Sequence, residues 1–185
     1  MFLIVALAVG LVVVGSAGKA AAWSGTAIDA QVDASLEQFK ETKGAGDLLK
    51  KAEGVLVFPK VFKAGFGIGG EYGEGALRIK GKTVDYYSTA AASIGFQLGA
   101  QKKTIILAFM KKSALDKFQN STGWKIGADA SVAVIAIGAD GSIDTASANE
   151  PIVAFVLDQK GLMYNLTLEG AKITKMKKQA ESAEK

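Results

Sequence analysis

Eleven residues decide the fold of this chain: Gly65-Phe66-Gly67-Ile68-Gly69-Gly70-Glu71-Tyr72-Gly73-Glu74-Gly75. Six of them are glycine, and they follow the apolar run 55–59. The spacing G-x-G-x-x-G, from Gly65 to Gly70, marks a dinucleotide site when a helix opens at the glycines. No helix is expected, because two more glycines follow and each interior glycine costs a helix about 1 kcal/mol relative to alanine. The next residues, 76–80, alternate as a short strand, so we predict extended chain and no nucleotide site.

As strand residues, the glycines leave one face of the chain bare. Gly65, Gly67 and Gly69 alternate, and side chains alternate between the two faces of a strand. A bare face lets another backbone lie close or lets a sheet bend sharply. Phe66 and Ile68 point the other way. We therefore predict that this stretch is first of all a packing device.

Several motifs in this order resemble the SYLF lipid-binding domain family, of a bacterial exported, single-domain type. They occupy residues 54–59, 63–75, 86–90, 95–101, 123–124 and 161–170. The resemblance runs from about residue 28 to residue 175. It implies a lipid-binding module without enzymatic activity, since eukaryotic SYLF domains recognise phosphoinositides and some bind actin filaments. The residues that match the family motifs are expected to have structural roles. These residues are Gly65, Gly67, Gly69, Gly70, Tyr72, Gly73, Gly75 and Trp124.

Composition removes several classes of function. The 185 residues include no histidine and no cysteine. Imidazole acid–base chemistry, thiolate nucleophiles and the usual structural zinc sites are therefore excluded. The net charge of +4 is mild, whereas nucleic-acid binders usually carry a stronger basic stripe. We expect no cofactor, no metal and no nucleic-acid partner.

The N-terminus carries a separate signal. Residues 2–15 form an unbroken apolar run, shorter than the about 20 residues that span a bilayer. Small residues at 20–22 suit cleavage of a signal peptide, although no Lys or Arg precedes the run. We expect a signal peptide or N-terminal anchor at 1–22, a SYLF-like domain at 23–175 and a polar tail at 176–185. The protein is then exported, and periplasmic or envelope-associated.

The periodicity predicts two N-terminal helices and a third further along. Helix 26–43 carries one apolar stripe, with Thr26 and Asp29 as a capping box. Helix 47–53 ends at Gly54. A second capping box, at 113–116, opens a short helix that buries Leu115 and Phe118.

Short alternating runs predict the strands. Turns are expected at 81–82 and 140–141. The expected strands are 55–62, 65–72, 76–80, 83–89, 91–100, 103–110, 125–137, 152–157 and 162–168, with Ile173 in a last short one. The fold class is therefore α+β: a strongly curled or closed, barrel-like antiparallel sheet with N-terminal helices packed on it.

Two sets of side chains are candidates for chemistry. Glu71, Glu74 and Asp85 would lie on neighbouring strands, and paired carboxylates can hydrolyse glycosides. The odd spacing of the two glutamates places them on opposite faces of a regular strand, so solvated or salt-bridged acids are favoured. Basic residues around one phenylalanine are the second set, since each lysine near an anionic bilayer contributes about 1 kcal/mol. The candidate lipid-contacting residues are Lys50, Lys51, Lys60, Phe62, Lys63, Lys102, Lys103, Lys111 and Lys112.

These observations leave several hypotheses open. The first is a non-enzymatic module that associates peripherally with anionic phospholipid or the cell envelope. The alternatives are an envelope structural or interaction protein that binds a protein or glycan, and a carrier of a small apolar ligand inside the curled sheet. The remaining alternative is a small hydrolase that uses carboxylates, and the missing His and Cys argue against it. The oligomeric state stays open.

Overall fold

The computed structural model describes residues 24–95, 101–135, 142–143, 149–157, 168 and 170–177, with the backbone alone at 64–68, 93–95 and 101. The predictions for 1–22, for the turn at 140–141 and for most of 162–168 and of the tail therefore lie outside the described residues. Within these ranges no helix is long and apolar enough to cross a membrane.

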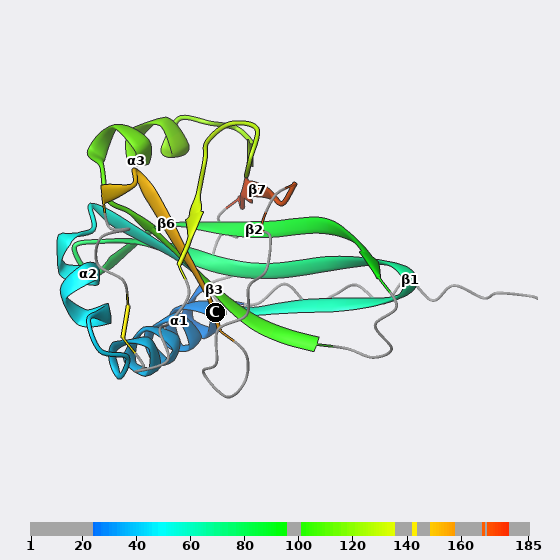
Figure 1. Cartoon of the computed structure of the whole chain (residues 1–185), viewed down its shortest axis with the longest axis horizontal. Helices are drawn as coiled ribbons and strands as arrows, with labels where there is room; N and C mark the ends of the chain where they lie inside the picture. The colour runs from blue at the N-terminus through cyan, green and yellow to red at the C-terminus, as the bar shows by residue number, and fades with distance from the viewer. Residues whose placement is uncertain are drawn as a thin grey trace, which may run out of the picture.

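Three helices and one seven-stranded sheet make up the described fold. The sheet has the order β4-β7-β2-β1-β3-β6-β5, and every pairing is antiparallel except that of β5 with β6. The sheet is strongly curled (Figure 1), which confirms the predicted α+β class. The elements are α1 Gly25–Lys40, α2 Ala45–Lys51, β1 Gly54–Ile79, β2 Lys82–Gly95, β3 Gln101–Phe109, α3 Lys112–Gln119, β4 Trp124–Lys125, β5 Ala133–Val134, β6 Ile152–Leu157 and β7 Lys172–Lys175.

Strand β1 is the centre of the sheet and turns back on itself. Its first arm pairs with β3 from Gly54 to Lys63, and its second arm pairs with β2 from Gly67 to Ile79. The reversal falls between them, and Figure 1 shows β1 running out to a tip and returning. The prediction of three separate strands over 55–80 was wrong, because the chain stays extended from Gly54 to Ile79. In the same way the predicted strands 83–89 and 91–100 are joined in β2 as far as Gly95.

Glycine is required where the two arms of β1 approach each other. A Cβ atom at Gly75 would lie 2.0 Å from the carbonyl oxygen of Val57, and one at Gly73 would lie 2.8 Å from that of Lys60. Both neighbours are backbone atoms, which cannot move aside as a side chain can. Two backbones therefore approach closely at Gly73 and Gly75, whereas the sequence predicted the bare face at Gly65, Gly67 and Gly69.

The turn between β1 and β2 is built from two residues with left-handed backbone. Lys80 has φ 50° and Gly81 has φ 76°. Positive φ at both central residues matches the twist of a hairpin. The prediction of a turn at this point is confirmed, one residue earlier than the expected pair 81–82.

Each face of the sheet has its own hydrophobic cluster. One cluster contains residues from both β7 and β6, which lie towards opposite edges of the sheet. Such residues can meet only on the concave face of a curled sheet, so this cluster fills that face. It includes Leu107, Phe118 and Trp124. The other lies under α1 and contains Ile28 and Val32 with partners from β1, β3 and β6. The expected apolar stripe of α1 and the burial of Leu115 and Phe118 are confirmed.

Several local predictions were wrong at element ends. Ser24 caps α1 and Lys111 precedes α3 without a side-chain cap, so neither capping box forms. Gly54 begins β1 and does not close α2, which ends at Lys51. The single strand expected over 125–137 is interrupted after β4, because Gly127 has φ 87° and a turn follows before β5.

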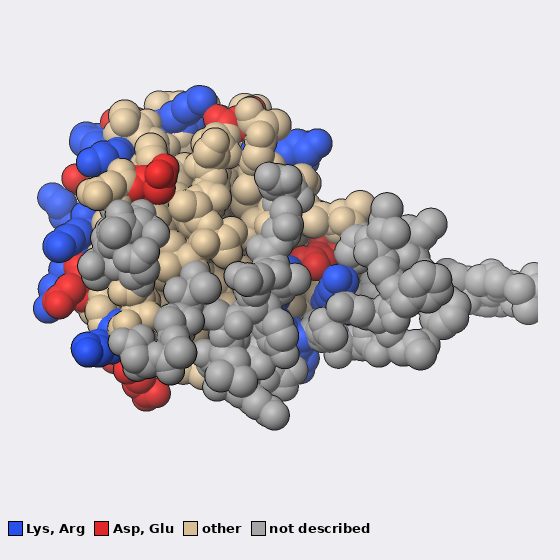
Figure 2. Space-filling view, in the orientation of Figure 1, with Lys and Arg blue, Asp and Glu red and all other residues tan. Residues whose placement is uncertain are grey.

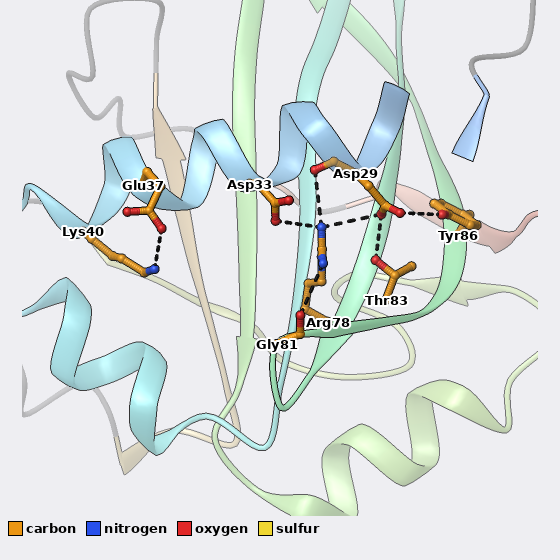
Figure 3. A network of polar contacts seen from close by, with 8 residues as sticks. All are labelled: Asp29, Asp33, Glu37, Lys40, Arg78, Gly81, Thr83 and Tyr86. Carbon is orange, nitrogen blue, oxygen red and sulfur yellow. Dashed lines mark hydrogen bonds and ion pairs between the residues drawn. The ribbon is translucent and has the colours of Figure 1, made fainter. Parts of the chain in front are cut away.

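A polar network holds α1 on the sheet (Figure 3). The Asp29 carboxylate accepts hydrogen bonds from Thr83 Oγ1 at 2.7 Å and from Tyr86 Oη at 2.8 Å. Arg78 extends from β1 and pairs with Asp33 at 2.7 Å and with Asp29 at 3.6 Å. The prediction that Asp29 belongs to a helix cap is wrong, because its carboxylate contacts side chains of β2.

We expect Gly75→Ala to lower the free energy of unfolding by about 3 kcal/mol, because the new Cβ meets backbone that is already packed. Chemical denaturation measures this loss. Gly46→Ala is the matched control: a Cβ there meets nothing within 4 Å, and inside α2 it should stabilise the protein by about 0.5–1 kcal/mol. Equal effects of the two substitutions would contradict the close approach of the arms.

We expect a double-mutant cycle of Asp29→Ala and Tyr86→Phe to give a coupling energy of about 1 kcal/mol, typical of a hydrogen bond. Glu37→Ala, which breaks an exposed pair with Lys40 on the same helix, should cost only about 0.3 kcal/mol. A coupling indistinguishable from zero would show that the contact does not hold α1.

The pKa of Tyr86 provides a second readout of the same contact. Burial, and then the hydrogen bond to Asp29, raise this pKa from 10.0 to about 12. Because the folded-state pKa is the higher one, the neutral phenol stabilises the fold below pH 10, and this contribution is lost as the pH rises through 12. In Asp29→Ala the tyrosinate absorbance of Tyr86, taken as a difference from Tyr86→Phe, should titrate closer to pH 10.

Candidate functional site

The candidate basic residues lie at two opposite ends of the molecule. Lys50, Lys51, Lys111 and Lys112 belong to the end formed by α2 and α3. The other candidates lie towards the tip of β1, at the far end of the β1–β3 ladder, which runs from the Gly54 pair to the Lys63 pair. At about 3.3 Å per residue, these ends are about 30 Å apart. The structure therefore divides the predicted lipid-contacting set into two clusters.

Acidic side chains accompany the lysines of the α2–α3 end. Lys50 pairs with Asp47 at 3.2 Å and Lys112 pairs with Asp116 at 2.9 Å. The hydrogen bond to Asp116 raises the pKa of Lys112. Figure 2 shows blue and red side chains interleaved at this end. The positive potential here is therefore partly cancelled.

Two lysines near the tip form ion pairs with one carboxylate. Glu71 lies 2.5 Å from Lys103 Nζ and 3.8 Å from Lys63 Nζ. The three side chains are only 12–22% exposed. Lys103 pairs with the buried Val61, which places it on the concave side of the sheet. Lys63 and Lys103 were predicted to contact lipid, and the structure turns them towards Glu71.

The remaining tip residues surround a small groove. Phe62 is 38% exposed and Tyr72 is 49% exposed, and Lys102 Nζ lies 5.3 Å from the centroid of the Phe62 ring. A pocket of about 40 Å³ lies beside them. We call this pocket the tip groove, and its lining includes Ile28 and Gln31 of α1 with Lys60, Phe62, Tyr72 and Glu74 of β1.

Tyr72 belongs to this groove, although the family motif suggested a purely structural role. Its hydroxyl donates a hydrogen bond of 2.8 Å to Glu74. Burial and this hydrogen bond raise the pKa of Tyr72 to about 12, so the phenol is neutral at ordinary pH. Alternation along β1 places Tyr72 and Glu74 on one face, and that spacing was the signal available in the sequence.

Trp124 is buried in the cluster that fills the concave face. Its side chain is 2% exposed. Its ring meets Phe118 edge-to-face with centroids 5.3 Å apart. This arrangement is a favourable geometry for an aromatic pair.

The three candidate catalytic acids, Glu71, Glu74 and Asp85, do not form one cluster. Glu71 pairs with lysines, Glu74 accepts from Tyr72, and Asp85 pairs with Lys175 at 2.8 Å. In the β1–β2 register Asp85 lies opposite Leu77, three positions from Glu74. Among the described residues there is also no group of acids that could hold a metal ion. The geometry favours salt-bridged and hydrogen-bonded acids over a hydrolytic pair.

Comparison with known proteins identifies the family. The family model named Ysc84 and described as "Las17-binding protein actin regulator" matches residues 90–183, just over half of the chain. A search of curated proteins finds no match. The matched range begins within β2 and lies after the glycine stretch and the β1 residues of the tip groove. The family is one of binding domains, and the SYLF resemblance predicted from the motifs is confirmed. This chain belongs to the Ysc84 family of SYLF domains.

Proposed function

We propose that this chain is a non-enzymatic lipid-binding module that associates peripherally with anionic phospholipid through the tip of β1. One observation carries the proposal: two exposed aromatic side chains, Phe62 and Tyr72, are flanked by the exposed lysines Lys60 and Lys102. Aromatic rings suit the depth of lipid headgroups, and lysines are attracted to an anionic surface.

Order-of-magnitude energies support weak, reversible binding. Two lysines contribute about 2 kcal/mol, and insertion of one phenylalanine contributes about 2 kcal/mol. Their sum corresponds to a dissociation constant of about 1 mM. A module of this strength needs a second attachment, and the apolar segment 2–15 is our candidate if it is retained as an anchor.

The cellular setting is part of the same proposal. The apolar N-terminal segment supports export to the periplasm or association with the envelope. An exported protein does not meet actin or cytosolic phosphoinositides. Our proposal for this chain is therefore binding without catalysis, and it does not include the actin regulation in the family description.

Surface binding is favoured over the two other binding hypotheses. Buried side chains such as Leu107, Phe118 and Trp124 occupy the concave face in the described part of the chain. This packing gives little support to a small apolar ligand carried there. An envelope protein as the partner would use the same aromatic residues, and the dependence of binding on lipid and salt separates the two cases.

We expect the full chain to co-sediment with phosphatidylglycerol vesicles more strongly than with phosphatidylcholine vesicles, and salt to remove the difference. The double variant Lys60→Glu and Lys102→Glu should bind the anionic vesicles at least about thirtyfold more weakly, because two lysines contribute about 2 kcal/mol and the two glutamates are in addition repelled by the surface.

The matched control is Lys50→Glu with Lys51→Glu, which makes the same change of net charge at the α2–α3 end. It should bind within about twofold of the unchanged chain if each charge acts only close to the surface that it touches. An equal loss in both variants would mean that net charge, and not the tip, drives binding. Capture by an envelope protein without any preference for anionic vesicles would replace the lipid proposal with the interaction-protein alternative.

A further inference from the structure

The tip groove carries charges of both signs. Lys60 lines it together with the carboxylate of Glu74, and Lys102 lies over the neighbouring Phe62. A purely anionic headgroup would suit the lysines but would place its charge against Glu74. A headgroup with an anionic phosphate and a cationic end matches both signs.

The lining of the groove suits a cation. Phe62 and Tyr72 present aromatic rings, which attract ammonium groups through their π faces. The Glu74 carboxylate accepts a hydrogen bond from Tyr72, and its negative charge attracts an ammonium group. The side-chain amide of Gln31 adds another acceptor from α1.

Hydrogen bonding distinguishes the cationic headgroups. The ammonium group of ethanolamine carries N–H donors, which the amide oxygen of Gln31 and a carboxylate can accept. The trimethylammonium group of choline has no N–H and cannot donate to either.

We propose that the tip groove recognises the phosphoethanolamine headgroup of a lipid, with its ammonium between Glu74, Tyr72 and Phe62 and its phosphate against Lys60 and Lys102. The inference rests on the proposed function, because the groove reaches a bilayer headgroup only if the tip of β1 contacts the membrane. It deepens that function by naming a headgroup that the net charge of the protein would not select.

The test compares vesicles that share one fraction of phosphatidylglycerol and differ in the remaining lipid, phosphatidylethanolamine or phosphatidylcholine. We expect the full chain to bind the ethanolamine vesicles about two- to tenfold more tightly, the range for one hydrogen bond at a partly exposed site. Glu74→Gln should lose this preference and keep its dependence on phosphatidylglycerol. Glu53→Gln, the same charge change next to α2, should keep both.

The vesicle comparisons distinguish the failure of this inference from the failure of the proposed function. A preference for ethanolamine that persists in Glu74→Gln would come from bilayer packing and would overturn the inference alone, as would equal binding to the two vesicle types. Loss of the phosphatidylglycerol dependence would overturn the proposed function. Titration with soluble O-phosphoethanolamine, followed by amide shifts at Tyr72 and Glu74, tests the groove without a bilayer. Shifts no larger than those with phosphocholine would also overturn the inference.

Discussion

The close approach of the two arms of β1 is the constraint on which the rest of the structure depends. At Gly75 there is room for a hydrogen atom but not for a methyl group beside the carbonyl of Val57. The arms can therefore lie together, and the first then pairs with β3 while the second pairs with β2. Every other strand of the described sheet joins through these two. The curl of the sheet and the separation of its two hydrophobic clusters follow from this core.

The same hairpin explains why charged residues that look alike in the sequence have different environments. Lys60 and Lys63 are three positions apart, so a strand places them on opposite faces. Lys63 turns towards the concave face and Glu71, while Lys60 lines the tip groove beside α1. A long hairpin also carries its tip away from the helical end, which separates the two groups of lysines. Location in the fold, and not the number of basic residues, therefore decides which lysines can meet a surface.

Much of the fold could be predicted from periodicity, and most of the site could not. The buried stripe of α1 and the strand Ile152–Leu157 are long enough to be read locally. The strand expected over 125–137 failed, because apolar residues continue through a turn that Gly127 permits. Asp29 was misassigned because its partners Thr83 and Tyr86 are more than fifty positions away. The ion pairs of Lys63 and Lys103 were not predicted for a similar reason, since only the folded sheet brings both lysines to Glu71.

The tip groove combines features that single-residue reasoning treats separately. Two lysines alone would make a weak electrostatic contact that salt removes, and two exposed aromatic residues alone would make a nonspecific apolar one. Glu74 changes this balance, because a carboxylate beside a membrane-facing surface is repelled by anionic lipid. Its position in the groove with Lys60 fits a surface that binds a headgroup of mixed charge, for which the carboxylate is a binding partner. Polar contacts then supply selectivity where the total binding energy is small, which is the usual division of roles between apolar area and charge in recognition.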